Sequence, residues 1–423
     1  MSLPDPVLPG RDPAQHLVVR SHPVEGVSPT LMDHLPDGGA LAWVRRGDGL
    51  VGWGVAARLD VAGRNRFDDA LAWWKALTGA AVVRDDVGVP GSGLVCFGSF
   101  GFTDDDPGEL VVPEVVVGRR GGTTWVTTIS PASSLVTPPE LARHEPVPVG
   151  EVAFADGARS GTEWSLVVAD AVTRITGGDL DKVVLARDLI ALAAEPIDLR
   201  WPLRRLAATY PNCWTFSVDG LIGATPELLV RREKGLITSR VLAGTIRRTG
   251  DDTHDLALAA SLARSSKDLE EHEFSVRSVA DALKPHCKSM NVPETPFVLH
   301  LPNVMHLASD VAGVAANGAS SLGLAAALHP SAAICGTPTD VARDLIGEIE
   351  GMSRGRFSGP VGWMDAGGDG EWCIALRCGQ ADPDDPTRMR LFAGAGIVAG
   401  SDPEAELAET NAKLVPMRDA LGD

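Results

Sequence analysis

The sequence is poor in cysteine and in the patterns that bind zinc. Only 6 of its 423 residues are cysteines, and they form neither a CxxC pair nor a CxxC…HxxxH arrangement. The 10 histidines include no HExxH pattern. A zinc site and a dense disulfide framework are therefore not expected. Reduced thiols are typical of cytoplasmic proteins, and we expect the protein to be cytoplasmic.

Long apolar runs are also missing. No uncharged apolar stretch approaches the roughly 20 residues of a transmembrane helix. Residues 1–15 contain several prolines and no apolar core, which is not typical of a signal peptide. We therefore expect a protein that neither spans nor binds a membrane.

Positive charge is scarce as well. The chain has 38 Lys and Arg residues against 56 Asp and Glu residues, which gives a formal net charge of -18. Such a chain repels phosphate backbones, so nucleic acid is excluded as a partner. A small anionic substrate would also be repelled, unless a metal ion or a few placed cations reverse the local field.

The order of the expected elements indicates an α+β fold. Strands and helices do not alternate regularly, which disfavours a βαβ repeat. A proline-rich stretch at 131–162 predicts a loop or connection. Strands are predicted at 40–45, 51–58, 94–100, 123–129, 182–188, 215–218, 221–224, 236–239, 359–364, 372–377 and 389–393. Helices are predicted at 66–77, 162–176, 251–286, 319–328, 338–350 and 403–413.

Acidic residues border the apolar stripe of the helix predicted at 251–286. This stripe includes Val276 and Leu283, and Asp268 and Glu271 lie beside it at helical spacing. Carboxylates in that position could ligate a hard cation. The alternative is a solvated acidic flank.

The last predicted helix repeats this theme. Asp402 is placed to cap it, and Glu406, Glu409 and Lys413 then share one face. Two carboxylates and a lysine suit a Mg²⁺ ion that holds a substrate carboxylate. The alternative is an exposed salt bridge between Glu409 and Lys413. We expect Pro416 to kink or end this helix.

Two further titratable residues stand beside predicted strands. Lys182 opens a mostly apolar strand, where it could face a pocket and act as a base or simply be solvated. Glu227 follows a turn in the string GATPELL. It could donate a proton to a leaving hydroxyl, or it could start a helix after Pro226.

The glycine-rich run at 394–400 resembles a dinucleotide-binding loop. Its third glycine stands one place too late for G-x-G-x-x-G, and too little chain follows for a βαβ unit. A dinucleotide-dependent oxidoreductase is therefore disfavoured.

Several strings along the chain belong together. They are KVVLAR at 182–187, GATPELLVR at 223–231, LAGTIRR at 242–248, SSKDLEEHE at 265–273, HLASDVAG at 306–313, LHPSAAICGTP at 328–338, SGPVGWMDAGGDGEWCIALRC at 358–378 and LFAGAGIVAGSDPEAELAET at 391–410. In this order they resemble the chorismate-utilising enzymes, which include anthranilate, salicylate and isochorismate synthases. Within that family the chain most resembles the isochorismate synthases. The resemblance is dense from residue 160 onward and thin before residue 150.

This resemblance implies the fold and the ligands. The family fold is α+β, with a single large domain of two stacked antiparallel sheets flanked by helices. Residues 1–150 would add a strand-rich part to that domain, and residues 151–423 would form the chorismate-binding catalytic core. The resemblance also implies chorismate as substrate, Mg²⁺ as cofactor and a monomeric protein.

The resemblance gives two of the residues catalytic roles. Lys182 lies where isochorismate synthases carry the general base that activates water, and Glu227 lies where they carry the general acid. The implied reaction adds water at C2 of chorismate and removes the C4 hydroxyl. Burial would favour the protonation states that both roles require.

It also implies a metal and substrate site. Glu271 and Glu409 match the Mg²⁺ ligands, and Asp268 and Glu406 match carboxylates that lie behind those ligands. The positions that hold the substrate carboxylates are Arg377 and Lys413, and those that line the pocket are Gly244, Thr245, His306, Ala333 and Gly394.

Other family members differ at particular positions. Anthranilate synthases typically carry glutamine in place of Lys182, and aminodeoxychorismate synthases carry lysine in place of Ala243. Salicylate synthase is the alternative function, because it shares the base lysine and the LAGT string and then eliminates pyruvate from isochorismate. A non-catalytic chorismate-binding protein is disfavoured by the presence of Lys182 and Glu227.

Overall fold

A computed structural model describes residues 16–133, 141–301, 304–316 and 318–422, except for the side chains of Lys267 and Glu271. The segment 1–15, which we expected not to be a signal peptide, and part of the proline-rich connection lie outside the described residues. In the part of the chain that the structure describes, no helix is both long and apolar enough to cross a membrane.

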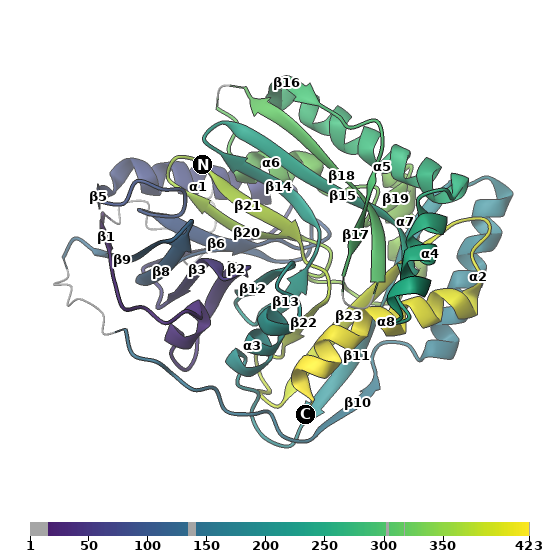
Figure 1. Cartoon of the computed structure of the whole chain (residues 1–423), viewed down its shortest axis with the longest axis horizontal. Coiled ribbons are helices and arrows are strands. Elements are labelled where there is room, and N and C mark those ends of the chain that lie inside the picture. Colours follow the sequence, from purple (N-terminus) through teal and green to yellow (C-terminus); the bar gives the residue numbers. More distant parts are fainter. Residues whose placement is uncertain (1–15, 134–140, 302–303, 317, 423) are drawn as a thin grey trace, which may run out of the picture.

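The larger of two sheets joins strands from both ends of the described chain (Figure 1). Its 13 strands in the described residues are β1 (Leu17–Pro23), β2 (Leu41–Arg45), β3 (Asp48–Trp53), β5 (Val82–Asp85), β8 (Val115–Arg120), β9 (Thr123–Pro131), β10 (Val152–Asp156), β11 (Lys182–Ala193), β12 (Trp214–Val218), β13 (Leu221–Thr225), β19 (Gly336–Thr337), β22 (Cys378–Ala381) and β23 (Arg388–Ile397). They lie in the order β10-β11-β23-β22-β13-β12-β2-β3-β8-β9-β1-β5, and β19 pairs with β11. Only β1 and β5 run parallel to each other among these described pairs.

The second sheet mixes early and late parts of the chain in the same way. Its 10 strands in the described residues are β4 (Ala57–Val61), β6 (Val95–Ser99), β7 (Gly108–Val112), β14 (Leu228–Glu233), β15 (Leu236–Arg247), β16 (Cys287–Asn291), β17 (Phe297–His300), β18 (Val304–Ala315), β20 (Pro360–Asp365) and β21 (Gly370–Ile374). They lie in the order β16-β18-β15-β14-β21-β20-β6-β7-β4, and β17 pairs with β18. The strands from the first third of the chain therefore belong to both sheets.

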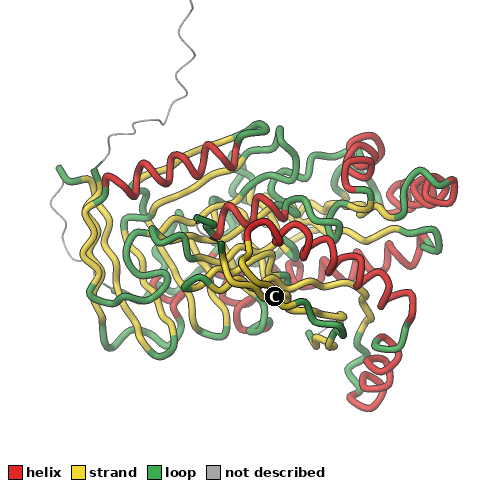
Figure 2. Tube along the Cα trace, turned by 90° about the horizontal axis from the view of Figure 1, so that it is seen from above, coloured by secondary structure: helices red, strands yellow, loops and turns green. Residues whose placement is uncertain are grey.

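Helices flank the two sheets. They are α1 (Arg66–Ala80), α2 (Gly161–Gly177), α3 (Arg200–Thr209), α4 (Asp252–Leu262), α5 (Ser266–Leu283), α6 (Ser321–Leu328), α7 (Thr339–Ile349) and α8 (Pro403–Leu421), with short 3₁₀ turns η1 (Leu31–His34) and η2 (Lys284–His286). Figure 2 shows strands through the left and middle of the molecule, one helix along their upper side and several helices toward the right. Helix α5 packs on β15 and β18, and α8 packs on β23 and α2.

A core rich in aromatic side chains fills the space between the sheets. Trp43 and Phe216 from the larger sheet and Phe97 and Trp363 from the smaller one belong to the same buried cluster. Large rings of this kind each bury about 150–250 Å². The carboxylate of Glu371 lies at the edge of this core, where it accepts hydrogen bonds from the indoles of Trp43 (2.6 Å) and Trp214 (3.2 Å) and from Arg231 (2.6 Å). Its charge is therefore buried with its hydrogen bonds satisfied.

The predicted fold class is confirmed: the chain has an α+β fold with two large sheets. The single helix predicted at 251–286 is wrong, because α4 ends at Leu262 and α5 begins after Ser265. The Ser265 side chain accepts a hydrogen bond from the backbone of Asp268, which starts a new helix.

The predicted bounds of one strand and of one further helix are also wrong. The strand predicted at 51–58 is two strands, since β3 ends at Trp53 and β4 begins at Ala57. Between them Gly54 has a φ of +72°, which turns the chain from one sheet to the other. The last helix is longer than the predicted 403–413, because α8 continues through Pro416 to Leu421. Buried Leu414, Met417 and Leu421 hold this final part against the sheet.

Candidate active site

A cavity with a volume of about 270 Å³ opens between the larger sheet, the smaller sheet and helices α5 and α8. Residues from β11, β15, β18 and β23 and from the connections that follow β13 and β21 contribute to its wall. The residues that line it are Lys182, Val184, Pro226, Glu227, Leu242, Ala243, Gly244, Thr245, Asp268, His306, Ala333, Ile334, Phe357, Ser358, Leu376, Arg377, Phe392, Ala393, Gly394, Gly396, Val398, Ser401, Glu406, Glu409 and Lys413.

Lys182 enters the cavity from the first position of β11. There the strand pairs with β19 on one edge, Lys182 lying opposite Thr337, and with β23 on the other edge from Val183 onward. The lysine is half-buried. Pairing of Lys182 with β19 and of Val183 with β23 positions the start of the strand at the cavity, which Lys182 lines.

Glu227 lies in the short connection between β13 and β14. It is only 8 % exposed, and its backbone N–H donates to the side chain of Thr225 (3.3 Å). Burial raises the pKa of Glu227 to about 7, against the opposing effect of nearby Arg377, Lys413 and Lys182. A carboxyl group with this pKa can carry a proton near neutral pH and donate it.

The wall formed by β15 and α5 depends on a glycine. Gly244 has a φ of +77°, and it interrupts the pairing of β15 with β18 as a bulge. A Cβ atom at this position would lie 3.1 Å from Cβ of Asp268 on α5. Gly244 therefore lets the strand approach the helix closely, and Asp268 borders the cavity at this point.

Helix α8 brings acidic and basic side chains together. Asp402 caps its first turn by accepting a hydrogen bond from the backbone of Ala405 (2.9 Å), as predicted. The amine of Lys413 contacts the carboxylate of Glu409 (2.6 Å) and donates to the carbonyl of Gly394 on β23 (2.8 Å). The side chain of Lys413 is 14% exposed and that of Glu409 is 34% exposed, so this pair is half-buried rather than the fully exposed salt bridge of the alternative interpretation.

The charges around Glu409 keep it ionised. Burial alone would raise its pKa, but Lys413, Arg377 and Lys182 together hold the pKa of Glu409 below its usual value. Glu406 lies one turn earlier on the same helix and also lines the cavity.

Arg377 supplies a cation on the opposite wall. Its backbone has a φ of +49°, a left-handed conformation that is uncommon for a residue with a side chain. Desolvation lowers the pKa of Arg377, although a guanidinium stays charged at neutral pH. The strained backbone aims a fixed positive charge at the cavity.

His306 contributes a neutral imidazole from β18. Its Nδ1 lies 3.0 Å from the hydroxyl of Thr245, and its Nε2 is buried with no hydrogen-bond partner among the described residues. Burial, together with Arg377 and Lys413, lowers the pKa of His306 to about 3. The unpaired nitrogen offers one hydrogen bond to a bound molecule.

All but one of the site residues predicted from the sequence meet at this cavity. The exception is Glu271, which belongs to α5 but whose side chain lies outside the described residues. Two cavity residues were not predicted from the sequence: Phe357 and Phe392, whose stacked rings have centroids 5.1 Å apart. Both stand in or beside the matching strings, but an apolar ring carries no charge that would mark it in a sequence.

The donor set at the α5 and α8 end of the cavity fits a hard divalent cation. The carboxylates of Asp268, Glu406 and Glu409 line it, and oxygen ligands are those that Mg²⁺ prefers. Among the described side chains no group of three potential ligands is close enough to hold a metal ion. This statement does not cover the side chain of Glu271, which lies outside the described residues and follows Asp268 by one turn of α5.

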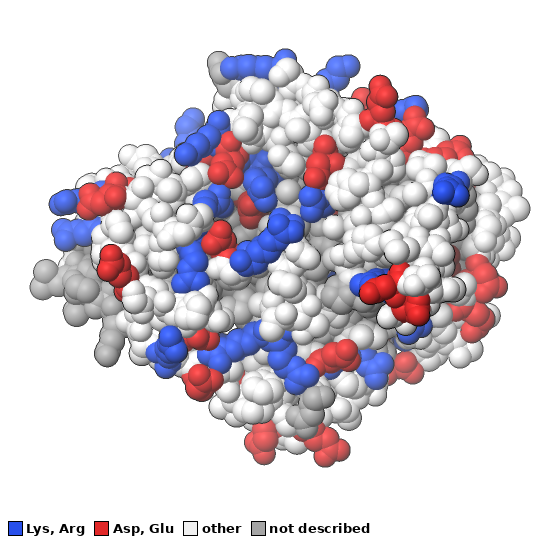
Figure 3. Space-filling model, in the orientation of Figure 1, with Lys and Arg blue, Asp and Glu red and all other residues white. Residues whose placement is uncertain are grey.

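The distribution of charge is uneven over the surface. On the face shown in Figure 3, Lys and Arg side chains gather toward the middle, while acidic side chains mark much of the right and lower edges. Three cations, Lys182, Arg377 and Lys413, line the cavity itself. The overall charge of -18 therefore does not prevent a small anion from binding there.

Comparison with known proteins agrees with the geometry. The family model described as chorismate binding enzyme matches residues 15–422. Isochorismate synthase DhbC of Bacillus subtilis is 43% identical over 267 residues, which cover 60% of this chain and 66% of that protein. The salicylate biosynthesis isochorismate synthase of Pseudomonas aeruginosa is 33% identical over 415 residues, covering 90% of this chain and 84% of that protein.

A solved structure shows the same fold along nearly the whole chain. The putative 2,3-dihydroxybenzoate-specific isochorismate synthase DhbC from Bacillus anthracis has a TM-score of 0.77 and 33% sequence identity. The match covers 92% of this chain and 98% of that chain. The family resemblance of the sequence strings is thus confirmed, and the chain belongs to the chorismate binding enzymes.

Proposed function

We propose that the protein is an isochorismate synthase, an isomerase that converts chorismate to isochorismate. The observation that carries this proposal is that Lys182 and Glu227 line the same cavity, with the pKa of Glu227 raised to about 7. A base and a protonated acid in one enclosed space are what the exchange of a hydroxyl group between two ring carbons requires.

The two residues would act on different carbons of the ring. Lys182 accepts a proton from water while the water oxygen bonds to C2. The ring double bond shifts, and the C4–O bond breaks. Glu227 donates its proton to the departing C4 hydroxyl, which leaves as water. One water is consumed and one is released, so the reaction balances. General acid and base assistance of this kind contributes about 10²–10⁴-fold each.

Cations would hold the two carboxylates of the substrate. Arg377 and Lys413 line the cavity, and the neutral His306 offers a hydrogen bond through Nε2. Glu409 and Glu271 would hold a Mg²⁺ ion, with Asp268 and Glu406 nearby. When bound, Mg²⁺ supplies a positive charge that neutralises a substrate carboxylate.

Salicylate synthase is the less favoured alternative. That activity would add the elimination of pyruvate from isochorismate. Both relatives compared above carry isochorismate synthase in their names, including the Pseudomonas aeruginosa protein of salicylate biosynthesis. Anthranilate synthesis is disfavoured by Lys182, as the sequence analysis indicated.

Identification of the product tests the proposal. The purified protein is incubated with chorismate and Mg²⁺, and the products are followed by NMR. We expect isochorismate in equilibrium with chorismate, without pyruvate. Salicylate together with pyruvate would instead establish the alternative, and unchanged chorismate would refute both.

A further inference from the structure

Residues 184–188 of strand β11, which follow Lys182 and Val183, lack a neighbouring strand on one edge. On that edge β19 pairs only with Lys182 and Val183, and β10 pairs only from Leu189 onward. The backbone groups of Val184 and Ala186 face this gap, since the N–H of Val184 bonds to Cys335 on the same side (2.8 Å). Buried backbone groups need partners, so something must take the place of the missing strand.

A buried ion pair fills the gap. Glu350 and Arg354 are both 2 % exposed, and Arg354 donates to both carboxylate oxygens, at 2.8 Å and 2.6 Å. The same carboxylate accepts the N–H of Ala186 (2.8 Å), and Arg354 also donates to the carbonyl of Val184 (2.6 Å). The pair thus makes two of the hydrogen bonds that a neighbouring strand would make to β11, while the indole of Trp164 donates to the carbonyl of Ala186 (3.0 Å).

Arg354 reaches a second wall of the cavity as well. It donates to the carbonyl of Ile334 (3.0 Å), next to Ala333, and both of these residues line the cavity. The guanidinium packs over the ring of Phe102, 4.2 Å from its centroid. With a fixed fork of donors, an arginine can hold two backbone segments at a set separation, which a lysine cannot do.

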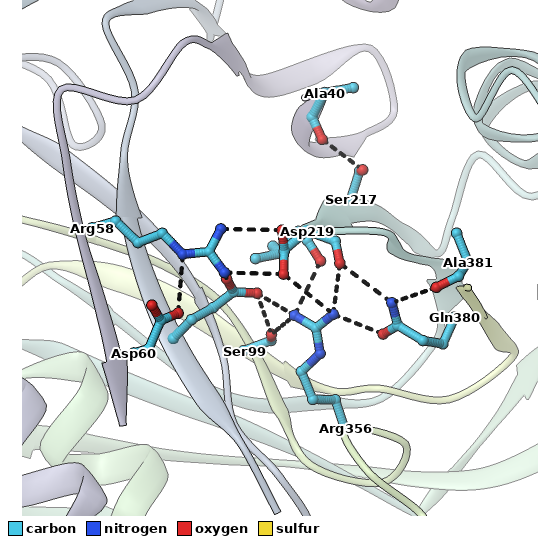
Figure 4. A network of polar contacts seen from close by, with 11 residues as sticks. Ala40, Arg58, Asp60, Ser99, Ser217, Asp219, Arg356, Gln380 and Ala381 are labelled. Atoms are coloured by element: carbon cyan, nitrogen blue, oxygen red, sulfur yellow. Dashed lines mark hydrogen bonds and ion pairs between the residues drawn. The ribbon is translucent and has the colours of Figure 1, made fainter. Parts of the chain in front are cut away.

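The segment that carries Arg354 is itself anchored on its other side. Arg356 donates to Ser99 (2.8 Å), to the carbonyl of Asp219 (2.6 Å) and to Gln380 (2.7 Å). Figure 4 shows this network converging on Arg356. The next residue, Phe357, lines the cavity. The ion pair is therefore held from both sheets rather than attached to a loose loop.

We propose that Glu350 and Arg354 are positioning residues for the reaction: they fix the start of β11, and with it Lys182, relative to the Ala333–Ile334 wall of the cavity. This proposal rests on the function proposed for Lys182. Neither residue lines the cavity. They act through the backbone of the strand that carries the base, and a displacement of about 1 Å there can cost up to about 100-fold in rate.

The test variant is Glu350→Gln, which keeps the size of the side chain but removes its charge. The matched control is Glu348→Gln, at the same end of α7. Glu348 makes a similar two-pronged pair with Arg174 (2.6 Å and 3.0 Å), but its side chain is 60% exposed. The measurements are kcat and KM for chorismate, Tm, and hydrogen exchange of the peptide spanning 182–188.

For Glu350→Gln we expect kcat to fall by about 10- to 100-fold. We expect KM to change little, because Arg377 and Lys413 belong to other elements. Exchange at 182–188 should become faster. The control should keep wild-type kcat and exchange. If folded Glu350→Gln shows wild-type kcat, or if its losses only follow the fraction of folded protein, the proposal is wrong.

Two further measurements keep the test decisive. Should Glu350→Gln fail to fold, Arg354→Lys takes its place, since it keeps the charge next to Glu350 but cannot hold Val184 and Ile334 together. Lowered kcat in folded Arg354→Lys supports the proposal, and wild-type kcat overturns it. Should the wild-type protein make no isochorismate, the proposed function fails, and hydrogen exchange alone decides whether the pair fixes β11.

Discussion

The carboxyl group of Glu227 is buried between β13 and β14, and its environment opposes ionisation. Burial raises the pKa of Glu227 from 4.5 to about 7. The folded protein therefore holds this proton more tightly than the unfolded chain does. The stabilisation is fully present below pH 4.5 and is lost as the pH rises through about 7.

Glu227→Gln should remove this dependence on pH. Relative to the wild type, the variant should gain free energy of unfolding between pH 4.5 and pH 7. The expected gain is on the order of 3 kcal/mol. Chemical denaturation of both proteins across this range measures it. A constant difference between the two proteins would show that Glu227 is not held protonated. In the wild type, kcat should also fall as the pH rises above about 7.

At the level of single residues, the sequence indicated which side chains could react but not which of them are buried. Glu227 could be selected by its string, yet its burial depends on strands far apart in the chain. The stacked Phe357 and Phe392 carry no polar atom, so no pattern marks them as cavity residues. Glu350 and Arg354 are charged, but no local pattern marks them either, because their partners on β11 are more than a hundred residues away in the sequence.

Helix α8 shows how a local signal positions part of the site. Its first turn is capped by Asp402 and includes Glu406, and Glu409 follows on the next turn. The cap, the acidic first turn and the shared face were all predictable, because they depend only on spacing within one helix. The extent of the helix was not predictable, because packing of Leu414 and Met417 overrides the break expected at Pro416.

Asp402→Ala should destabilise the protein by about 1 kcal/mol, the usual cost of a lost N-cap. Loosening the first turn should also weaken the binding of Mg²⁺ at Glu409. Glu404→Gln, an exposed change in the same turn, is the control. Thermal unfolding with and without Mg²⁺ checks both effects. Equal stability of the two variants would contradict the role of the cap.

Strand and helix boundaries in the middle of the chain were harder to predict. Residues 251–286 form two helices because Ser265 caps a second one. The long β15 was predicted only as far as Ser239 but continues to Arg247, with a bulge at Gly244 that breaks the alternation of side chains. In both cases one polar or small residue interrupts a regular pattern.

For the whole molecule, the sequence predicted the class of the fold but not its topology. Strands from the first third of the chain lie in both sheets, and β11 lies beside β23 although about 200 residues separate them. Such pairings depend on contacts across the core. The family resemblance supplied the architecture of two stacked sheets that propensities alone could not.

A metal ion bound by Glu409 and Glu271 would join α8 to α5, two helices distant in sequence. A ligand that binds only the folded state stabilises it by about 2.7 kcal/mol at about 100 times its Kd. Mg²⁺ should therefore raise the Tm of the wild type but not that of Glu409→Gln. Chelation should reverse the rise and abolish activity. An equal effect of Mg²⁺ on both proteins would place the ion elsewhere.

The central claim is that Lys182 activates a water molecule for addition at C2 of chorismate. The most direct measurement is the reaction in H₂¹⁸O, with the position of the label read by mass spectrometry and NMR. The wild type should place ¹⁸O at C2 of isochorismate, and Lys182→Ala should form this product about 10²–10⁴-fold more slowly. Isochorismate formed without ¹⁸O at C2, or formed at the wild-type rate by Lys182→Ala, would contradict the account.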